Sequence, residues 1–318
     1  MKILYGINGE GLGHISRSTK IIEELRCAGH TVHIACMNDE VLTKNDIKIG
    51  GVSLKFKNQK IKKLSSIIDF FNLPIDKYIS LIEGKYGVVD LVITDFEPIT
   101  ARYARKNKIN LISIDNQHRF ARIDKNLPLK YRAYNLLLCL LLKVFIGKVN
   151  DYIVTCFYPQ EDSVGVLCKD AETADNNFTL VYLKDEFIDK FVSAYPFDDF
   201  TYIYCKSPEK FKGKYYHDNL VFCGLDKINF NKMLKNCSRV ISNAGNQIAG
   251  ECVYYNKPIT CIPIKGQIEQ EINGFYLEFH GLGKVSNFNN LVINNKKPDA
   301  NIENGIHKIM ERLGKWLK

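Results

Sequence analysis

A glycine-rich segment near the N-terminus holds the first residues that could do chemistry. Its sequence, GINGEGLGHISRS, follows an apolar run and leads into a helix-like segment with Ser16 near the expected helix start. Such a loop lets backbone amides approach an anion at a helix N-terminus. His14 lies where the turn opens, and an imidazole there could act as a general base. The alternative is a histidine that only hydrogen bonds within the loop.

The glycines of this loop do not follow the dinucleotide-binding motif G-x-G-x-x-G. Gly9, Gly11 and Gly13 alternate with single residues, and His14 follows directly. The third glycine is therefore not at the offset that the motif requires. An oxidoreductase that binds a dinucleotide is the least favoured interpretation.

A second segment, in the C-terminal third of the chain, also places small residues between an apolar run and a helix. After the run RVIS the chain makes a turn of Asn243, Ala244, Gly245 and Asn246. The helix expected next, at 247–255, would direct the backbone amides of its first turn at an anion such as a phosphate. Glu251 lies on this helix, on or near the side that faces the turn.

Polar side chains gather again where the next apolar run, PITCIP, gives way to a helix. The segment KGQIEQEIN holds Gln267, Glu269, Gln270 and Asn273. Amide and carboxylate groups supply many directional donors and acceptors, which suits the hydroxyls of a sugar and a ribose. The alternative is an ordinary solvated helix start, because a glutamate near a helix N-terminus is stabilising by itself.

The elements around the first segment alternate between strand and helix. Strands are expected at 2–7, 30–36, 88–94, 109–114 and 151–157, with helices at 16–27 and 100–108. This alternation predicts an α/β fold with a doubly wound parallel sheet, whose ligands bind at the carboxyl ends of the strands.

The alternation starts again after an irregular linker at 163–177. Strands are expected at 178–183, 200–205, 219–223, 239–242 and 258–262, and the tail has apolar residues at helical spacing. The sequence therefore predicts a first domain at 1–170, a second α/β domain at 173–300 and a C-terminal helix at 301–318.

The composition is that of a globular protein with two cores. The chain has 318 residues, 46% of them hydrophobic and 25% charged. Its ten cysteines form no CxxC pair, and several, such as Cys36, Cys156, Cys205 and Cys261, lie in or beside apolar runs. Buried reduced thiols, and an N-terminus without the layout of a signal peptide, predict a cytoplasmic location. No Asp, His or Cys cluster has metal-ligand spacing, so no metal is expected.

The charge and one apolar stretch bear on partners. The formal net charge is +9, which favours nucleic acid, an acidic membrane surface or a phosphorylated substrate, although AT-biased coding could explain part of the lysine excess. The stretch Leu136–Ile146 is too short to span a bilayer, and Lys143 interrupts it. It predicts a buried or half-buried helix. With the basic residues from Arg119 to Arg132, a peripheral membrane patch is the alternative.

Three segments together resemble a known family. Residues 9–18 resemble the GxGxGHxxRS opening of GT-B glycosyltransferases related to the MurG-type peptidoglycan transferase and the UDP-glucuronosyltransferases. LVITDFEP at 91–98 and ISIDNQH at 112–118 look like mid-domain strands of that family. Residues 241–283 look like its C-terminal donor signature, with NAG, a helix glutamate, KP, P-x-x-x-Q-x-E-Q-x-x-N and LG. The resemblance therefore spans nearly the whole chain.

The resemblance implies a GT-B fold with two Rossmann-like, doubly wound domains that face a central cleft. The C-terminal helix is expected to return to the N-terminal domain in such a fold. The N-terminal domain would hold the acceptor. The C-terminal domain would hold a nucleotide diphosphate sugar, expected to be a UDP-sugar, with no further cofactor.

The resemblance also implies roles for individual residues. His14 matches the acceptor base, and Asp95 matches the aspartate that orients it, a role for which Glu97 and Asp115 compete. Glu251 matches the carboxylate that binds the donor ribose. The other residues implied are Gly9, Gly11 and Gly13 in an acceptor or phosphate loop, Ser242, Asn243, Ala244 and Gly245 at the diphosphate, and Glu269 and Gln270 at the sugar. Gln267 of the polar cluster is expected beside the donor. Asn246 departs from the hydroxyl or bulky residue that relatives often carry.

These assignments predict a metal-independent hexosyl- or pentosyltransferase that inverts the anomeric centre. His14 would take the acceptor proton, and the helix after Gly245, assisted by Lys184 or Lys265, would stabilise the leaving diphosphate. Two alternatives with the same fold stay open: a nucleotide-sugar epimerase and a non-catalytic nucleotide-sugar-binding protein. The acceptor is either a modified DNA base, such as a phage hydroxymethylpyrimidine, or a cell-envelope or lipid-linked glycan. No stable protein partner is indicated.

Overall fold

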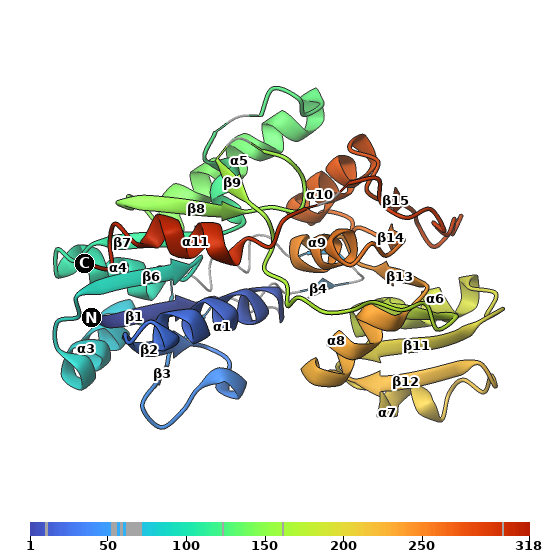
Figure 1. The fold of residues 1–318 in the computed structure, drawn as a ribbon, viewed down its shortest axis with the longest axis horizontal. Helices are drawn as coiled ribbons and strands as arrows, with labels where there is room; N and C mark the ends of the chain where they lie inside the picture. The colour runs from blue at the N-terminus through green and yellow to red at the C-terminus, as the bar shows by residue number, and fades with distance from the viewer. Residues whose placement is uncertain are drawn as a thin grey trace. The chain divides into compact units, whose positions relative to one another are not determined.

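The chain forms two compact units, each built around a parallel sheet (Figure 1). The computed structural model describes residues 1–9, 12–51, 56–57, 60–61, 72–122, 124–160, 162–300 and 302–318. The first unit comprises residues 1–56, 62–167 and 304–318, and the second comprises 57–61 and 168–303.

The sheet of the first unit is doubly wound. Its strands pair in parallel in the spatial order β3 (Ile47–Lys48), β2 (Thr31–Cys36), β1 (Lys2–Ile7), β6 (Leu91–Asp95), β7 (Leu111–Asp115), β8 (Asp151–Thr155) and β9 (Ser163–Val164). The chain winds outward in one direction from β1 to β3 and in the other from β6 to β9. The order therefore switches between β1 and β6, and the carboxyl ends of these two strands flank the place where such sheets bind ligands.

Apolar side chains on the two faces of this sheet form separate cores. On β1, Ile3, Tyr5 and Ile7 belong to one buried cluster and Leu4 belongs to the other, as the two-residue period of a strand requires. The described helices that cover the faces are α1 (Leu12–Cys27), α3 (Ile75–Tyr86), α4 (Pro98–Lys106), α5 (Leu129–Phe145) and α11 (Ile306–Leu313), with the 3₁₀ turns η1 (Asp39–Val41) and η2 (Gln117–Ala121).

The C-terminal helix α11 belongs to the first unit and packs beside α1 (Figure 1). Ile309 and Leu313 are fully buried in the cluster that includes Ile21 and Leu25 of α1. Arg312 donates to the backbone oxygens of Tyr152, at 2.9 Å, and Asp162, at 3.0 Å. These hydrogen bonds connect the last turn of α11 to β8.

The helix α1 begins earlier than the sequence suggested. It starts at Leu12, four residues before Ser16, so Ser16 lies inside the helix rather than at its N-cap. His14 is therefore a residue of the first helical turn and not of a loop. Because residues three apart lie on one helix face, this start places His14 and Arg17 on the same side.

Gly6 on β1 allows α4 to approach the sheet closely. A Cβ atom at Gly6 would lie 2.0 Å from Oγ1 of Thr100, a fully buried residue at the start of α4. We expect Gly6→Ala to lower the free energy of unfolding by about 1–3 kcal/mol, measured by urea denaturation, because a crowded core must shift to admit the methyl group. Gly84→Ala is the control, since its Cβ would meet open space on α3. An unfolding midpoint for Gly6→Ala equal to that of the wild type would contradict this packing.

The second unit repeats the doubly wound pattern. Its parallel strands follow the order β12 (Leu220–Gly224), β11 (Phe200–Cys205), β10 (Phe178–Tyr182), β13 (Arg239–Ser242), β14 (Ile259–Cys261) and β15 (Lys284–Val285). Its helices are η3 (Asp185–Phe187), α6 (Ile188–Ala194), α7 (Glu209–Lys212), α8 (Lys227–Asn236), α9 (Asn246–Tyr254) and α10 (Ile268–Phe279). Here the strand order switches between β10 and β13. The prediction of two doubly wound α/β domains is confirmed.

The structure also contains a small sheet besides the two main ones, and the ten cysteines, all in the described part of the chain, form no disulfide bond. The short strands β4 (Phe56–Lys57) and β5 (Lys60–Ile61) form a two-stranded sheet of their own. All ten cysteines are free, and Cys36, Cys156, Cys205 and Cys261 are buried, as their apolar surroundings predicted.

Candidate active site

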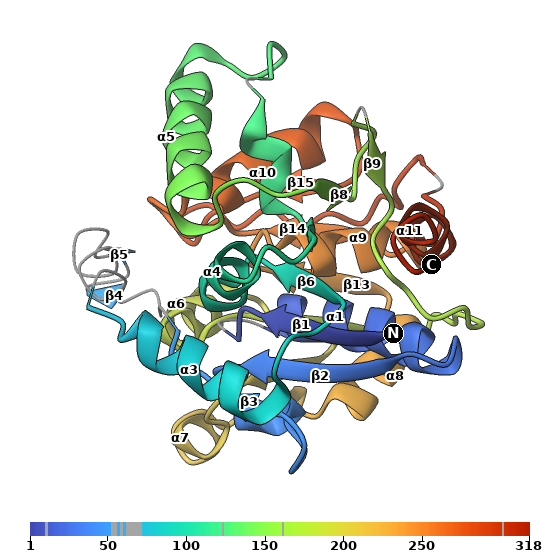
Figure 2. The ribbon, with the colours of Figure 1, turned by 90° about the vertical axis from the view of Figure 1, so that its left-hand side faces the viewer.

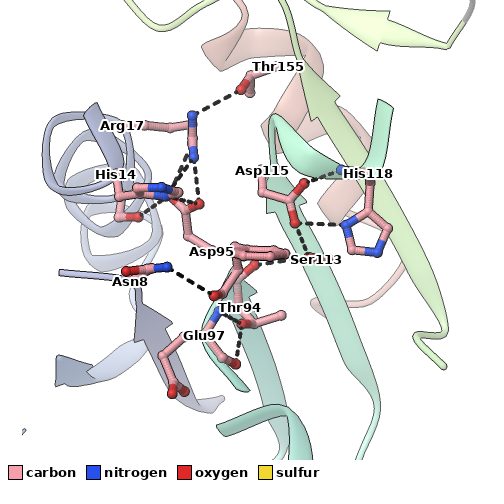
Figure 3. A network of polar contacts seen from close by, with 12 residues as sticks. Asn8, His14, Arg17, Thr94, Asp95, Glu97, Ser113, Asp115, His118 and Thr155 are labelled. Atoms are coloured by element: carbon pink, nitrogen blue, oxygen red, sulfur yellow. Dashed lines mark hydrogen bonds and ion pairs between the residues drawn. The ribbon is translucent and has the colours of Figure 1, made fainter. Parts of the chain in front are cut away.

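A histidine and an aspartate meet at the switch point of the first sheet (Figure 3). Asp95 is the last residue of β6 and pairs in register with Ile7, the last residue of β1. Nδ1 of His14, in the first turn of α1, lies 2.8 Å from Oδ1 of Asp95. The strand ends and the early start of α1 thus bring together two side chains that are 81 residues apart in the sequence.

The contact with Asp95 fixes which nitrogen of His14 can act as a base. Burial alone would raise the pKa of the Asp95 carboxyl, but the charges of Arg17 and His14 outweigh it and hold the pKa below its usual range. An ionised carboxylate only accepts hydrogen bonds, whereas the guanidinium of Arg17, whose Nη2 lies 3.2 Å from the same Nδ1, only donates. The contact with Asp95 is the shorter of the two, so we assign the proton of His14 to Nδ1. Nε2 then keeps its lone pair, and it makes no hydrogen bond to any residue that the structure describes. The His14 side chain is 18% exposed, so part of the side chain is accessible from solvent.

Arg17 organises the surroundings of this pair. Its Nε lies 3.1 Å from Oδ2 of Asp95 and its Nη2 lies 2.5 Å from Oδ1, while Nη1 donates to Oγ1 of Thr155 at the end of β8. The hydroxyl of Ser18 donates to Oδ2 of Asp95 at 2.9 Å. Asp95 is fully buried and Arg17 is 3% exposed, so the two opposite charges compensate each other away from water. Arg17 is not among the site residues predicted from the sequence, although its position three residues after His14 places it on the same face of a helix.

Glu97, the first rival of Asp95, serves another purpose. Its carboxylate caps α4 by accepting hydrogen bonds from the backbone amides of Ile99 and Thr100, both at 2.7 Å, and from the Thr100 hydroxyl at 2.6 Å. Burial raises the pKa of Glu97, and these hydrogen bonds oppose the shift. Phe96, which lies between Asp95 and Glu97 in the chain, has a positive φ of 53°.

Asp115, the second rival, pairs with a different histidine. Oδ2 lies 2.7 Å from Nδ1 of His118, and the backbone amide of His118 donates to Oδ1 at 2.7 Å. Burial would raise the pKa of Asp115, but His118 and the Ser113 hydroxyl lower it to about 2. Figure 3 shows this pair next to the His14 network, with Asp115 at the end of the neighbouring strand β7 and His118 in η2. Of the three candidate carboxylates, Asp95 is therefore the one that contacts His14.

The glycine loop is described in part. Gly9 packs against the segment after β2, since a Cβ atom there would lie 2.5 Å from Cγ of Met37. Gly13 lies in the first turn of α1. Gly11 lies outside the described residues.

The turn after β13 lies at the switch point of the second sheet and is tied to its neighbours by side chains. Oδ1 of Asn243 accepts from the amide of Lys184 after β10, at 3.2 Å, and its Nδ2 donates to the backbone oxygen of Ile262 after β14, at 3.0 Å. The Ser242 hydroxyl donates to the backbone oxygen of Tyr182 at 2.8 Å. Ser242 and Asn243 therefore hold the strand ends together.

The same turn leads directly into the N-terminus of helix α9. Gly245 is the N-cap residue of α9 and offers no side chain to the first turn of that helix. Asn273 of α10 donates to the backbone oxygen of Ala244 at 2.7 Å and so fixes the turn. A helix that starts directly after a strand and a small-residue turn has the arrangement of a phosphate site.

The predicted donor carboxylate and amides lie on α9 and at the start of α10. Glu251 is 6% exposed and accepts from Nε2 of Gln247 at 2.8 Å. Gln270 accepts from the amide of Ile264 at 2.9 Å, so its side chain shapes the loop after β14. Glu269 is half-buried. Gln267, the N-cap residue of α10, has a buried Oε1 atom without a hydrogen-bond partner among the described residues.

The two lysines expected to assist the leaving group, possible metal ligands and the cavities of the structure all bear on the predicted donor site. Lys265 is exposed, and the backbone of Lys184 contacts Asn243. Among the described residues, no three His, Cys, Asp or Glu side chains are grouped so that they could hold a metal ion. An open cavity of about 520 Å³ lies between β11, β12 and α8, and none of the predicted donor residues lines it.

The chain matches a known protein family over most of its length. The model of the family described as Glycosyl transferase family 1 matches residues 1–297. None of the curated protein sequences compared with the chain matches it.

Solved glycosyltransferase structures have a similar fold at low sequence identity. SnogD from Streptomyces nogalater gives a TM-score of 0.55 at 13% identity, with 100% of this chain and 95% of that chain covered. VinC in complex with dTDP gives 0.57 at 14%, with 92% and 88% covered. The rhamnosyltransferase SpnG, complexed with thymidine diphosphate, gives 0.58 at 13%, with 90% and 86% covered. At such identities the likeness concerns the fold alone.

Proposed function

Because the chain belongs to glycosyl transferase family 1, we propose that His14 is the base of a sugar transfer and that Asp95 orients it. The chain is a nucleotide-sugar-dependent glycosyltransferase of the GT-B type. The observation that carries the proposal is the 2.8 Å contact between Nδ1 of His14 and Oδ1 of Asp95 at the switch point of the first sheet.

The geometry suits deprotonation of an acceptor hydroxyl. Nε2 of His14 would accept the proton as the oxygen attacks the anomeric carbon, and Asp95 would stabilise the imidazolium that forms. Arg17 keeps Asp95 ionised, so it acts through Asp95 and positions the pair. Attack in line with the leaving diphosphate inverts the anomeric centre.

The second unit would bind the nucleotide at its own switch point. The amides at the start of α9, after Gly245, would face the diphosphate, and the positive end of the helix dipole would stabilise its charge as the bond breaks. Glu251 would bind the ribose hydroxyls, and Glu269, Gln270 and Gln267 the transferred sugar. Support for a sugar near Gln267 comes from its buried Oε1, which lacks a partner among the described residues and could accept from a hydroxyl.

We propose a donor with a pyrimidine base, either uracil or thymine, and no metal requirement. VinC and SpnG were each solved with a thymidine diphosphate. A screen of UDP, dTDP, GDP and ADP for thermal stabilisation tests the proposal, since a ligand that binds the folded state raises the melting temperature, and a tighter ligand raises it more at the same concentration. The screen is run with and without EDTA. Stabilisation by GDP or ADP alone, or by none of the four, would overturn the donor assignment.

Glu251→Ala gives a sharper test of the donor site. We expect it to weaken binding of the stabilising nucleotide by about 1–3 kcal/mol, the cost of removing a charged hydrogen-bond partner. Isothermal titration calorimetry measures this change. Glu278→Ala, an exposed glutamate near the end of α10, is the control and should bind normally. Unchanged nucleotide affinity in Glu251→Ala would remove Glu251 from the site.

A further inference from the structure

Helix α5 exposes an apolar stripe that the proposed site does not use. Leu129 is 81% exposed, and Leu136 and Leu140 are 51% and 52% exposed. Spacings of four and seven residues place side chains on one helix face. The stripe is completed by Leu137 and Val144, which are 40% and 46% exposed.

The opposite face of α5 packs into the first unit. Leu142 belongs to the same buried cluster as Ile99 and Tyr103, and Asn135 donates to the backbone oxygens of Phe120 and Arg122, each at 3.1 Å. Helix α5 is therefore half-buried, one of the two states expected from the sequence. Within its own unit α5 contacts η2, and α4 lies beside it (Figure 2).

Basic side chains border the stripe on both sides. At 100° per residue, Arg132 and Lys143 lie along one edge of the leucines and Lys130 lies along the other. All three are exposed. The 17 residues of α5 include no Asp or Glu. Arg119, which the sequence grouped with these basic residues, is buried and takes no part in the border.

We propose that this stripe docks on an anionic lipid surface, with α5 lying in the plane of the interface. A helix of 17 residues is about 25 Å long, and no helix in the described part of the chain is long and apolar enough to cross a bilayer. The leucines would enter the boundary between headgroups and acyl chains, and the lysines would lie near the lipid phosphates. This proposal concerns lipid binding and does not depend on the proposed function.

The charge pattern favours lipid over two other occupants. A second copy of the chain would bring the stripes together but would also place Lys130, Arg132 and Lys143 against like charges with no acidic residue on the helix to offset them. A nucleic acid would attract these cations but would leave the exposed leucines against a charged phosphate backbone. An anionic bilayer satisfies both the apolar and the basic side chains.

Vesicle flotation of the full chain tests the proposal. We expect the protein to float with phosphatidylcholine vesicles that contain phosphatidylglycerol and not with phosphatidylcholine alone. Leu136→Gln with Leu140→Gln should weaken this binding by roughly tenfold or more, because two apolar side chains no longer enter the bilayer. Lys130→Gln with Lys143→Gln should weaken it by about fivefold for each lysine.

Matched controls separate the stripe from general effects. Val88→Gln with Ile228→Gln removes two exposed apolar residues elsewhere, at 69% and 82% exposure, and should bind vesicles normally. Lys190→Gln with Lys210→Gln removes two exposed charges from the second unit. Glutamine has nearly the helix propensity of leucine, so each variant should keep the wild-type unfolding midpoint, which circular dichroism checks.

Four outcomes would overturn the proposal. The first is a wild type that floats with neither vesicle, and the second is binding that the leucine and lysine variants do not change. The third is a wild-type dimer that the leucine variant converts to a monomer, without vesicle binding, in size-exclusion chromatography. The last is a gel shift of duplex DNA that depends on the lysines and not on the leucines, again without vesicle binding.

Discussion

We expect His14→Ala to lower the rate of sugar transfer by about 10²–10⁴-fold, the range for loss of a general base. The reason is the state of the ring: Nδ1 is held by Asp95 at 2.8 Å, so Nε2 has the free lone pair. Donor affinity should not change, because His14 belongs to the first unit and the predicted donor residues belong to the second. Release of nucleoside diphosphate from the stabilising donor measures the rate, and calorimetry measures the affinity.

Three further variants make this prediction specific. Asp95→Asn should also lower the rate, because an amide no longer fixes the proton on Nδ1. Glu24→Ala, an exposed residue further along α1, should transfer sugar normally. His118→Ala distinguishes the two His–Asp pairs. If it abolishes transfer while His14→Ala stays near the wild-type rate, the base is His118 in η2 and His14 is structural.

The sequence predicted the sheets and the loops of the candidate site from local pattern. The strand that ends at Asp95 and the strand that ends at Ser242 are short apolar runs followed by turn residues, and each was expected within a few residues of its bounds. Since parallel strands of a doubly wound sheet end at one edge, polar residues after those runs were expected near a ligand. Local pattern thus placed both loops at a sheet edge, whereas Asp95 was implied only by the family resemblance.

The sequence could not show how the buried charges pair. Asp95, Glu97 and Asp115 all follow apolar runs, so the sequence does not distinguish them. In the structure Glu97 follows Phe96, which has a positive φ, and caps α4, while Asp115 contacts His118. Arg17 was missed because the helix start was placed at Ser16. A start at Leu12 is what sets Arg17 beside His14.

The exposure of α5 was beyond local pattern for a different reason. A leucine-rich helix has apolar residues on every side, so its sequence does not say which face meets the core. The contacts of Asn135 and Leu142 decide this, since they fix the inner face and leave Leu136 and Leu140 outside. Tertiary packing, and not propensity, settles such cases.

The second large effect is expected from Arg17→Met. This variant leaves the fully buried Asp95 carboxylate without its main positive partner. We expect the free energy of unfolding to fall by about 3–5 kcal/mol at pH 7, the usual cost of breaking a buried ion pair from one side. Urea denaturation measures the change. Lys20→Met, on the same helix, is the control and should cost much less, since Lys20 is only half-buried and donates to the backbone oxygen of Leu167.

The pH dependence gives this prediction its sign. In the wild type the pKa of Asp95 lies below its usual range, so the pair contributes stability above about pH 4 and loses it as the pH falls through the folded pKa. Without Arg17, burial should raise the pKa of Asp95 above its usual value. The carboxylate of the variant should then take up a proton above about pH 4 as the pH falls, and this removes the uncompensated charge. The stability difference between wild type and Arg17→Met should therefore be largest at neutral pH and narrow on acidification.

In the double variant with Asp95→Asn the loss of unfolding free energy should be smaller than the sum of the two single losses, because neither buried charge remains. Additive losses with no pH dependence would show that Arg17 stabilises the fold by packing and not by its charge.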